Sequence, residues 1–158
     1  FKMRSRTANW FECKIRYEKT VEDGTQKPVT EMYVVDALSF SEAEERITEE
    51  VSAYVSGSFD VKDIKKAAFG EIFFSDDSNA DRWFKTKLQF IILDEKSGKE
   101  KKSSVNFLVQ AGTFREALSN IEEGMKGTMQ DYVISSINET TIIDVFEYKK
   151  STPEFQGE

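Results

Sequence analysis

The sequence predicts an α+β fold, an internally duplicated β-β-α-β repeat that forms one pseudo-twofold domain with an antiparallel or mixed sheet and helices on one face. The first observation is composition, because 158 residues with 39% hydrophobic and 13% aromatic side chains can build the core of a single domain. The second is strand-type alternation of apolar residues, and the third is the recurrence of three blocks in the same order. We expect residues 3–148 to form this domain, with repeat one at 8–74 and repeat two at 81–148.

The recurring blocks keep a nearly constant spacing along the chain. The pairs are Trp10-Phe11 with Trp83-Phe84, Ser39-Phe40-Ser41-Glu42-Ala43 with Thr113-Phe114-Arg115-Glu116-Ala117, and Ile64 and Phe73 with Ile137 and Phe146. The polar link at 75–81 is too short to separate two independent bodies. We therefore expect two three-stranded sheets that join edge to edge into one six-stranded sheet, because neither half buries enough apolar surface alone.

The first strand of each repeat alternates between an apolar and a polar face. In repeat one the inward set is Phe11, Cys13, Ile15 and Tyr17, and in repeat two it is Phe84, Leu88, Phe90 and Ile92. Charged, glycine-containing loops at 18–30 and 94–103 then return the chain into the apolar runs at 33–35 and 107–109. Two hairpins follow from this pattern, and the third strands are expected at 68–74 and 140–148.

A helix should follow each hairpin. Ser39 stands three residues before Glu42, and Thr113 three before Glu116, which is the capping-box spacing that satisfies the first free amides of a helix. The apolar positions that follow have helical spacing and should cover one face of the sheet. They are Phe40, Ala43, Ile47, Val51 and Tyr54 in repeat one, and Phe114, Ala117, Ile121 and Met125 in repeat two.

Composition excludes several classes of function. The chain has no histidine, which excludes histidine-based triads and histidine-containing zinc sites. The single Cys13 can form neither an internal disulfide nor a cysteine metal cluster, which fits a reducing compartment. A net charge of −7 argues against a protein that binds duplex DNA through its overall charge. A basic surface on one face of the protein is still compatible with this total.

The two ends carry little functional information. The chain lacks a run of the roughly 20 apolar residues that span a bilayer and has no apolar signal-peptide core, so we expect a cytoplasmic protein with no membrane partner. Met3 has the character of a natural initiator, which makes residues 1–2 an expected tag remnant. The polar segment 149–158, interrupted by Pro153, is expected to be a flexible tail.

Three separated blocks resemble the domain-of-unknown-function family 4494, which is found in Bacteroides-type bacteria and their phages. They are the run at 9–19, the block at 34–44 and the run at 122–128, and together the resemblance spans residues 3–148. It brings no activity and no functional residues. It implies a small cytoplasmic protein of bacterial or phage origin.

The first candidate site is the sheet face opposite the helices. On this face each tryptophan is interleaved with cations: Trp10 with Lys14 and Arg16, and Trp83 with Lys85 and Lys87. Such a surface fits single-stranded nucleic acid, because each base stacked on an aromatic ring contributes about 1 to 3 kcal/mol and the cations bind the phosphate backbone. The structural alternative is that each tryptophan covers a sheet edge, packs against the other copy or contacts a second subunit. The cations would then be a solvated face.

The second candidate is Gly124-Met125-Lys126-Gly127, between a helix that ends near Glu123 and an expected second helix at 128–137. Its spacing is similar to the Gly-x-x-Gly loop with which KH domains clamp a nucleic-acid backbone, and Lys126 would add charge. The alternative is a glycine helix cap. Repeat one lacks such a loop.

The sequence gives little support for a metal site or for a nucleophilic cysteine. The spacing of Asp77, Asn79 and Asp81 is that of a calcium loop, but Arg82 replaces the required glycine and Leu88 the closing glutamate. Cys13 points into the predicted core with no histidine to activate it. We therefore expect no metal, no cofactor and no enzymatic activity.

These features lead to a non-enzymatic binding module whose expected partner is single-stranded DNA or RNA. The expected contacts are Trp10, Lys14, Arg16, Trp83, Lys85, Lys87 and Lys126. The first alternative is a protein-interaction or assembly module of phage or mobile-element origin, with a protein partner or self-association as a dimer. The second is a small-nucleotide sponge, which would need a closed pocket between the copies.

Overall fold

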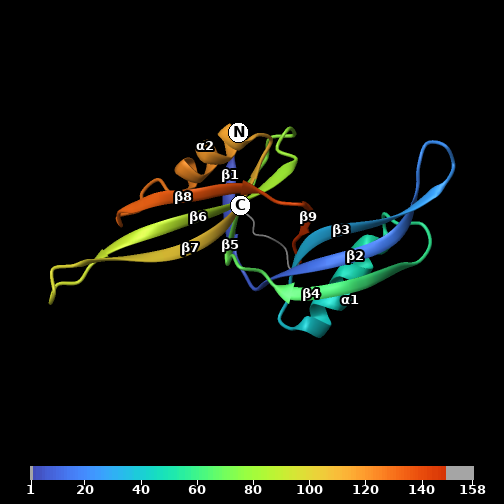
Figure 1. Ribbon diagram of the computed structural model, residues 1–158, viewed down its shortest axis with the longest axis horizontal. Helices are drawn as coiled ribbons and strands as arrows, with labels where there is room; N and C mark the ends of the chain where they lie inside the picture. Colours follow the sequence, from blue (N-terminus) through green and yellow to red (C-terminus); the bar gives the residue numbers. More distant parts are fainter. Residues whose placement is uncertain (1, 149–158) are drawn as a thin grey trace, which may run out of the picture.

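The computed structural model describes residues 2–148 and is an α+β fold of two mixed sheets and two helices (Figure 1). The expected tail at 149–158 lies outside the described residues, as does Phe1. The elements run in the order β1 (Met3–Thr7), β2 (Trp10–Thr20), β3 (Gln26–Asp36), α1 (Phe40–Ser52), β4 (Phe59–Lys66), β5 (Glu71–Ser75), β6 (Arg82–Leu93), β7 (Glu100–Ala111), α2 (Phe114–Gly124), β8 (Tyr132–Glu139) and β9 (Ile142–Phe146).

The strands form two sheets, which corrects the expectation of one six-stranded sheet. The five-stranded sheet has the order β1-β5-β7-β6-β8, and the four-stranded sheet has the order β4-β2-β3-β9. The reason is a crossover, since β5 pairs in parallel with β7, and β9 pairs in parallel with β3. Each half of the chain thus supplies its last strand to the sheet of the other half. Figure 1 shows the hairpins β2–β3 and β6–β7 extending in opposite directions from a centre that holds β1, β5 and β9.

Three strands were not expected from the sequence: β1, β4 and β8. The prediction of a helix at 128–137 is wrong, because Tyr132–Glu139 is the edge strand β8, paired with β6. An edge strand packs few of its side chains into the core, so its sequence lacks a strong period. In β4, for example, none of the eight residues is fully buried.

The two helices begin where the capping boxes place them. The Ser39 hydroxyl accepts from the Glu42 backbone N–H at 3.1 Å, and the Thr113 hydroxyl accepts from that of Glu116, also at 3.1 Å. The buried stripes are Ala43, Ile47 and Val51 in α1, and Ala117 and Ile121 in α2, with Met125 buried just after α2. The expected inward positions Phe40, Tyr54 and Phe114 are instead more than half exposed.

The apolar core has a part under each helix and a part between the sheets. Helix α1 covers the face of the four-stranded sheet that carries Phe11, Cys13 and Ile15, while α2 covers the corresponding face of the five-stranded sheet. The opposite faces, called open faces below, meet at the centre of the molecule, where they form a further cluster of buried side chains. That cluster contains Trp10, Val34, Phe69, Ile72, Phe74, Trp83, Leu108, Ile142 and Val145. Neither helix in the described part of the chain is long and apolar enough to cross a membrane.

Candidate nucleic-acid interface

The two tryptophans lie in the core, which corrects the expectation that they are stacking platforms for bases. Trp10 is 2% exposed and Trp83 is 3% exposed, and both belong to the cluster between the two sheets. The Phe74 ring lies between them, with centroid distances of 6.5 Å to Trp10 and 5.8 Å to Trp83. The Trp10 indole N–H donates to the backbone carbonyl of Gly70 at 3.2 Å. Alternation predicted their face correctly, but the other sheet covers that end of the face.

Lys14 and Arg16 are exposed on the open face of the four-stranded sheet, as expected. Their cross-strand neighbours on β4 are carboxylates, since Lys14 pairs in register with Asp63, and Arg16 with Asp60. Glu12 lies on the same face and forms an ion pair with Lys65 at 4.0 Å. This face therefore carries charges of both signs, which gives it little attraction for a polyanion.

Lys85 and Lys87 lie on the open face of the five-stranded sheet, in a different electrostatic setting. Lys85 is exposed and Lys87 is half-buried. The strand register places Asn138 beside Lys85, and Asn106 and Ser136 beside Lys87. From Lys85 to Gln89 the face carries no Asp or Glu, and we call this part the carboxylate-free face; it ends at Ile91, whose backbone N–H donates to the carbonyl of the exposed Asp131. Its residues are Lys85, Lys87 and Gln89 on β6, Ser104 and Asn106 on β7, and Val133, Ser136 and Asn138 on β8, and Lys102 borders it in the row of Ile91 and Asp131.

Sequence reasoning missed Lys102, a third cation at the border of this face. The residue lies opposite Ile91 in the β6–β7 hairpin and is exposed. The signal was available in principle, because Lys102, Ser104 and Asn106 alternate on the returning strand. To place Lys102 on the same face as Lys87, the pairing of β6 with β7 must be known. The charged loop between them does not reveal where the turn lies, so the sequence does not give this pairing.

Lys126 does not belong to a backbone-clamping loop. Its ammonium forms an ion pair with Glu123 at 3.1 Å, and the second helix that such a loop needs is replaced by β8. The two glycines serve packing and turning. A side chain at Gly124 would lie 2.7 Å from the Phe73 ring, and Gly127 adopts φ +84, a left-handed conformation that favours glycine.

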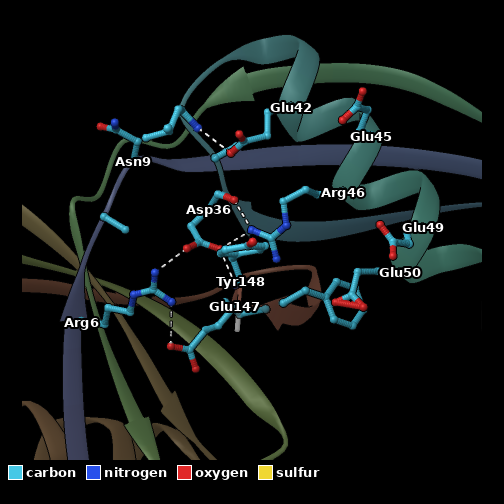
Figure 2. A pocket seen from close by; sticks show the side chains of 15 residues that line it. Arg6, Asn9, Asp36, Glu42, Glu45, Arg46, Glu49, Glu50, Glu147 and Tyr148 are labelled. Carbon is cyan, nitrogen blue, oxygen red and sulfur yellow. Dashed lines mark hydrogen bonds and ion pairs between the residues drawn. The ribbon is translucent and has the colours of Figure 1, made fainter. Parts of the chain in front are cut away.

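A pocket of about 1160 Å³ opens beside the sheet junction, and Figure 2 shows its charged lining. The α1 residues Glu42, Glu45, Glu49 and Glu50 line it, with Asp36 and Glu147. The Asp36 carboxylate is nearly buried and accepts from Arg6 at 2.5 Å, from Arg46 at 2.5 Å and from the Tyr148 backbone N–H at 2.7 Å. Glu147 pairs with Arg4 and Arg6. The arginines of the pocket are therefore already neutralised by carboxylates.

This network lowers the pKa of two carboxyls. Burial alone would raise the pKa of Asp36, but the hydrogen bonds from Arg46 and from the Tyr148 backbone, with the charges of Arg46 and Arg6, lower it below its ordinary value. Burial likewise acts to raise the pKa of Glu147, and the contacts with Arg4 and Arg6 lower it. Both groups are held in their ionised form.

Cys13 lies under α1 and is fully buried. Burial, assisted by the negative charges of Asp63 and Glu12, raises the pKa of the Cys13 thiol to about 12. A thiol with this pKa stays protonated at neutral pH, where the thiolate is the nucleophilic form.

The fold and these surfaces define a class, an α+β protein of two mixed sheets that exchange strands and leave one face of each sheet open. Residues 9–148 match the family described as domain of unknown function DUF4494, and the chain belongs to this family. Neither the curated proteins nor the solved structures contain a match.

Proposed function

We propose that the protein is a non-enzymatic binding module that holds single-stranded nucleic acid on the carboxylate-free face. The observation that carries the proposal is the segregation of charge. A chain of net charge −7 keeps Lys85 and Lys87 on a surface without Asp or Glu, with Lys102 at its border, whereas carboxylates lie directly beside Lys14 and Arg16 on the equivalent face of the other sheet. Polyanion binding depends on such local positive charge rather than on the total.

The polar neighbours of these lysines favour a single strand over a duplex. Gln89, Asn106 and Asn138 present amides beside the cations, and amides hydrogen-bond to base edges that are accessible in unpaired nucleic acid. Because both tryptophans are buried, the proposed contacts are ionic and polar. We expect binding that is strongly salt-sensitive and leaves tryptophan emission unchanged.

Fluorescence anisotropy with labelled single-stranded DNA and RNA tests the proposal. For three lysine–phosphate contacts, the slope of log affinity against log salt should be about −2. The variant K85Q/K87Q/K102Q should lose at least about tenfold in affinity at low salt. The matched control K14Q/R16Q/K65Q removes the same charge from the open face of the other sheet and should bind almost as well as the parent protein. Equal losses in both variants, or no binding by the parent at low salt, would overturn the proposal.

We also propose that the chain is a duplication of a β-β-α-β-β unit, one strand longer than expected from the sequence. The two sheets support this, because β4-β2-β3-β9 and β8-β6-β7-β5 have the same order when the halves are exchanged. The pairing of β2 with β4 and that of β6 with β8 shift register at corresponding points, where Lys62 and Ser135 are the extra residues.

A second candidate, a protein-interaction module, is favoured by the apolar end of the β6–β7 hairpin. Ile92 and Leu93 are 44% and 61% exposed, and Val105 is 36% exposed. A protein partner at this patch would bind with little dependence on salt. The double variant I92K/V105E should abolish such binding and leave nucleic-acid binding unchanged, since neither residue lies on the carboxylate-free face.

The acidic pocket does not favour the nucleotide-sponge alternative. It is open, and its carboxylates outnumber Arg6 and Arg46, so the phosphates of a nucleotide would meet repulsion.

A further inference from the structure

The edges of the two sheets are protected to very different degrees. Among the described residues the edge strands are β1 and β8 of one sheet and β4 and β9 of the other. An edge strand exposes unpaired backbone N–H and C=O groups, and proteins commonly shield such edges with charged side chains or very short strands.

Three of these edges have that protection. Strands β1 and β9 are five residues long, and β1 carries Arg4 and Arg6. Strand β4 has eight residues, of which five are charged: Asp60, Lys62, Asp63, Lys65 and Lys66. Its extra residue at the register shift is Lys62, which adds a charge where the edge is kinked.

Strand β8 is the exception. It is as long as β4 and occupies the equivalent place beside β6, yet its charged residue, Glu139, is the last in the strand. From Tyr132 to Asn138 it is uncharged and rich in strand-forming side chains, and Val133 is 42% exposed. At the register shift it carries Ser135 in place of the lysine of β4.

We propose that β8 is an interaction surface for a second copy of this chain, with the two β8 strands paired antiparallel across a twofold axis. The uncharged segment 132–138 is complementary to itself, and antiparallel pairing centred on Ser135 leaves the charged residues that flank it, Asp131 and Glu139, at the two ends of the contact. Such an isologous contact covers both unprotected edges at once and closes the assembly as a dimer. A peptide from another protein would cover β8 only in the copies to which it is bound, whereas self-pairing covers β8 in both copies of every dimer.

The pairing joins the two five-stranded sheets into one continuous sheet. A twofold axis perpendicular to that sheet keeps the carboxylate-free faces of both copies on the same side. The dimer does not rest on nucleic-acid binding, but it would extend the proposed basic surface across two molecules.

Sedimentation equilibrium of the full chain, free of nucleic acid, tests the proposal. The parent protein should shift from monomer to dimer between about 1 and 500 μM, because a short strand-to-strand contact is weak. Charge is a minor part of this contact, so the dimer should persist at high salt. The variant S135K introduces the residue that β4 carries at the same position and should remain monomeric. The control S119K adds the same charge on the exposed side of α2 and should dimerise as the parent does.

Hydrogen exchange identifies the edge that is covered. Amides of β8 should exchange more slowly at high protein concentration than at low concentration, whereas amides of β4 should not change. Thermal melting of S135K should match that of the parent, since Ser135 is exposed. A parent protein that stays monomeric throughout, or an S135K variant that dimerises normally, would overturn the proposal whether or not the protein binds nucleic acid.

Discussion

Arg6 on β1 donates to the carboxylate of Asp36 at the end of β3, with a distance of 2.5 Å, and so ties a strand of the five-stranded sheet to a strand of the four-stranded sheet. The same carboxylate accepts from Arg46 of α1 and from the Tyr148 backbone. Asp36 therefore connects both sheets, a helix and the segment after β9.

Replacing Asp36 with Asn should destabilise the protein by about 3 kcal/mol or more, because removal of one charge from a buried network leaves its partners uncompensated. Urea unfolding gives the free energy directly. The control is Glu139→Gln, since the Arg82–Glu139 pair is about half exposed on both sides and should contribute about 0 to 1 kcal/mol. Similar decreases in the free energy of unfolding of the two variants would show that the Asp36 network stabilises the protein no more than an exposed ion pair does.

The same network predicts how stability changes with acid. Because the pKa values of Asp36 and Glu147 are lowered in the folded state, the unfolded chain binds more protons as the pH falls below about 4. The stability that these groups contribute is present above that pH and is lost as the pH falls through their folded pKa values. Urea unfolding at a series of pH values should show this loss, and D36N should show a shallower one. An equal slope in parent and variant would contradict the assignment.

Tryptophan emission should report the shared core. Since Trp10 and Trp83 are 2% and 3% exposed, native emission should be blue-shifted and poorly quenched by acrylamide, and both properties should be lost on unfolding. Truncation of Trp83 to Ala should cost about 3 to 5 kcal/mol by opening a cavity. Native emission at the wavelength of the unfolded chain would place the indoles in solvent.

Cys13 should be inert in the native protein. Its thiol is buried, with a pKa of about 12, so a chromogenic disulfide reagent at about pH 8 should react at the rate of unfolding rather than at the rate of a free thiol. In urea the reaction should be immediate. Fast reaction without denaturant would show that α1 does not cover the thiol.

Several features of this protein follow from local sequence alone. The hairpins, the caps at Ser39 and Thr113 and the inward face of β2 depend on neighbouring residues, because alternation and capping act over a few positions. The placement of Lys85 and Lys87 on the face opposite α2 follows from the same alternation.

Tertiary structure decided the rest. The crossover of β5 and β9 is a long-range pairing that no local pattern encodes, and it buries Trp10 and Trp83 by bringing the two open faces together. The contrast between the open faces depends on which side chains lie across the strand, carboxylates beside Lys14 and Arg16 but amides and hydroxyls beside Lys85 and Lys87. Alternation determines the face on which a side chain lies, whereas its exposure and its charged neighbours depend on residues distant in the sequence.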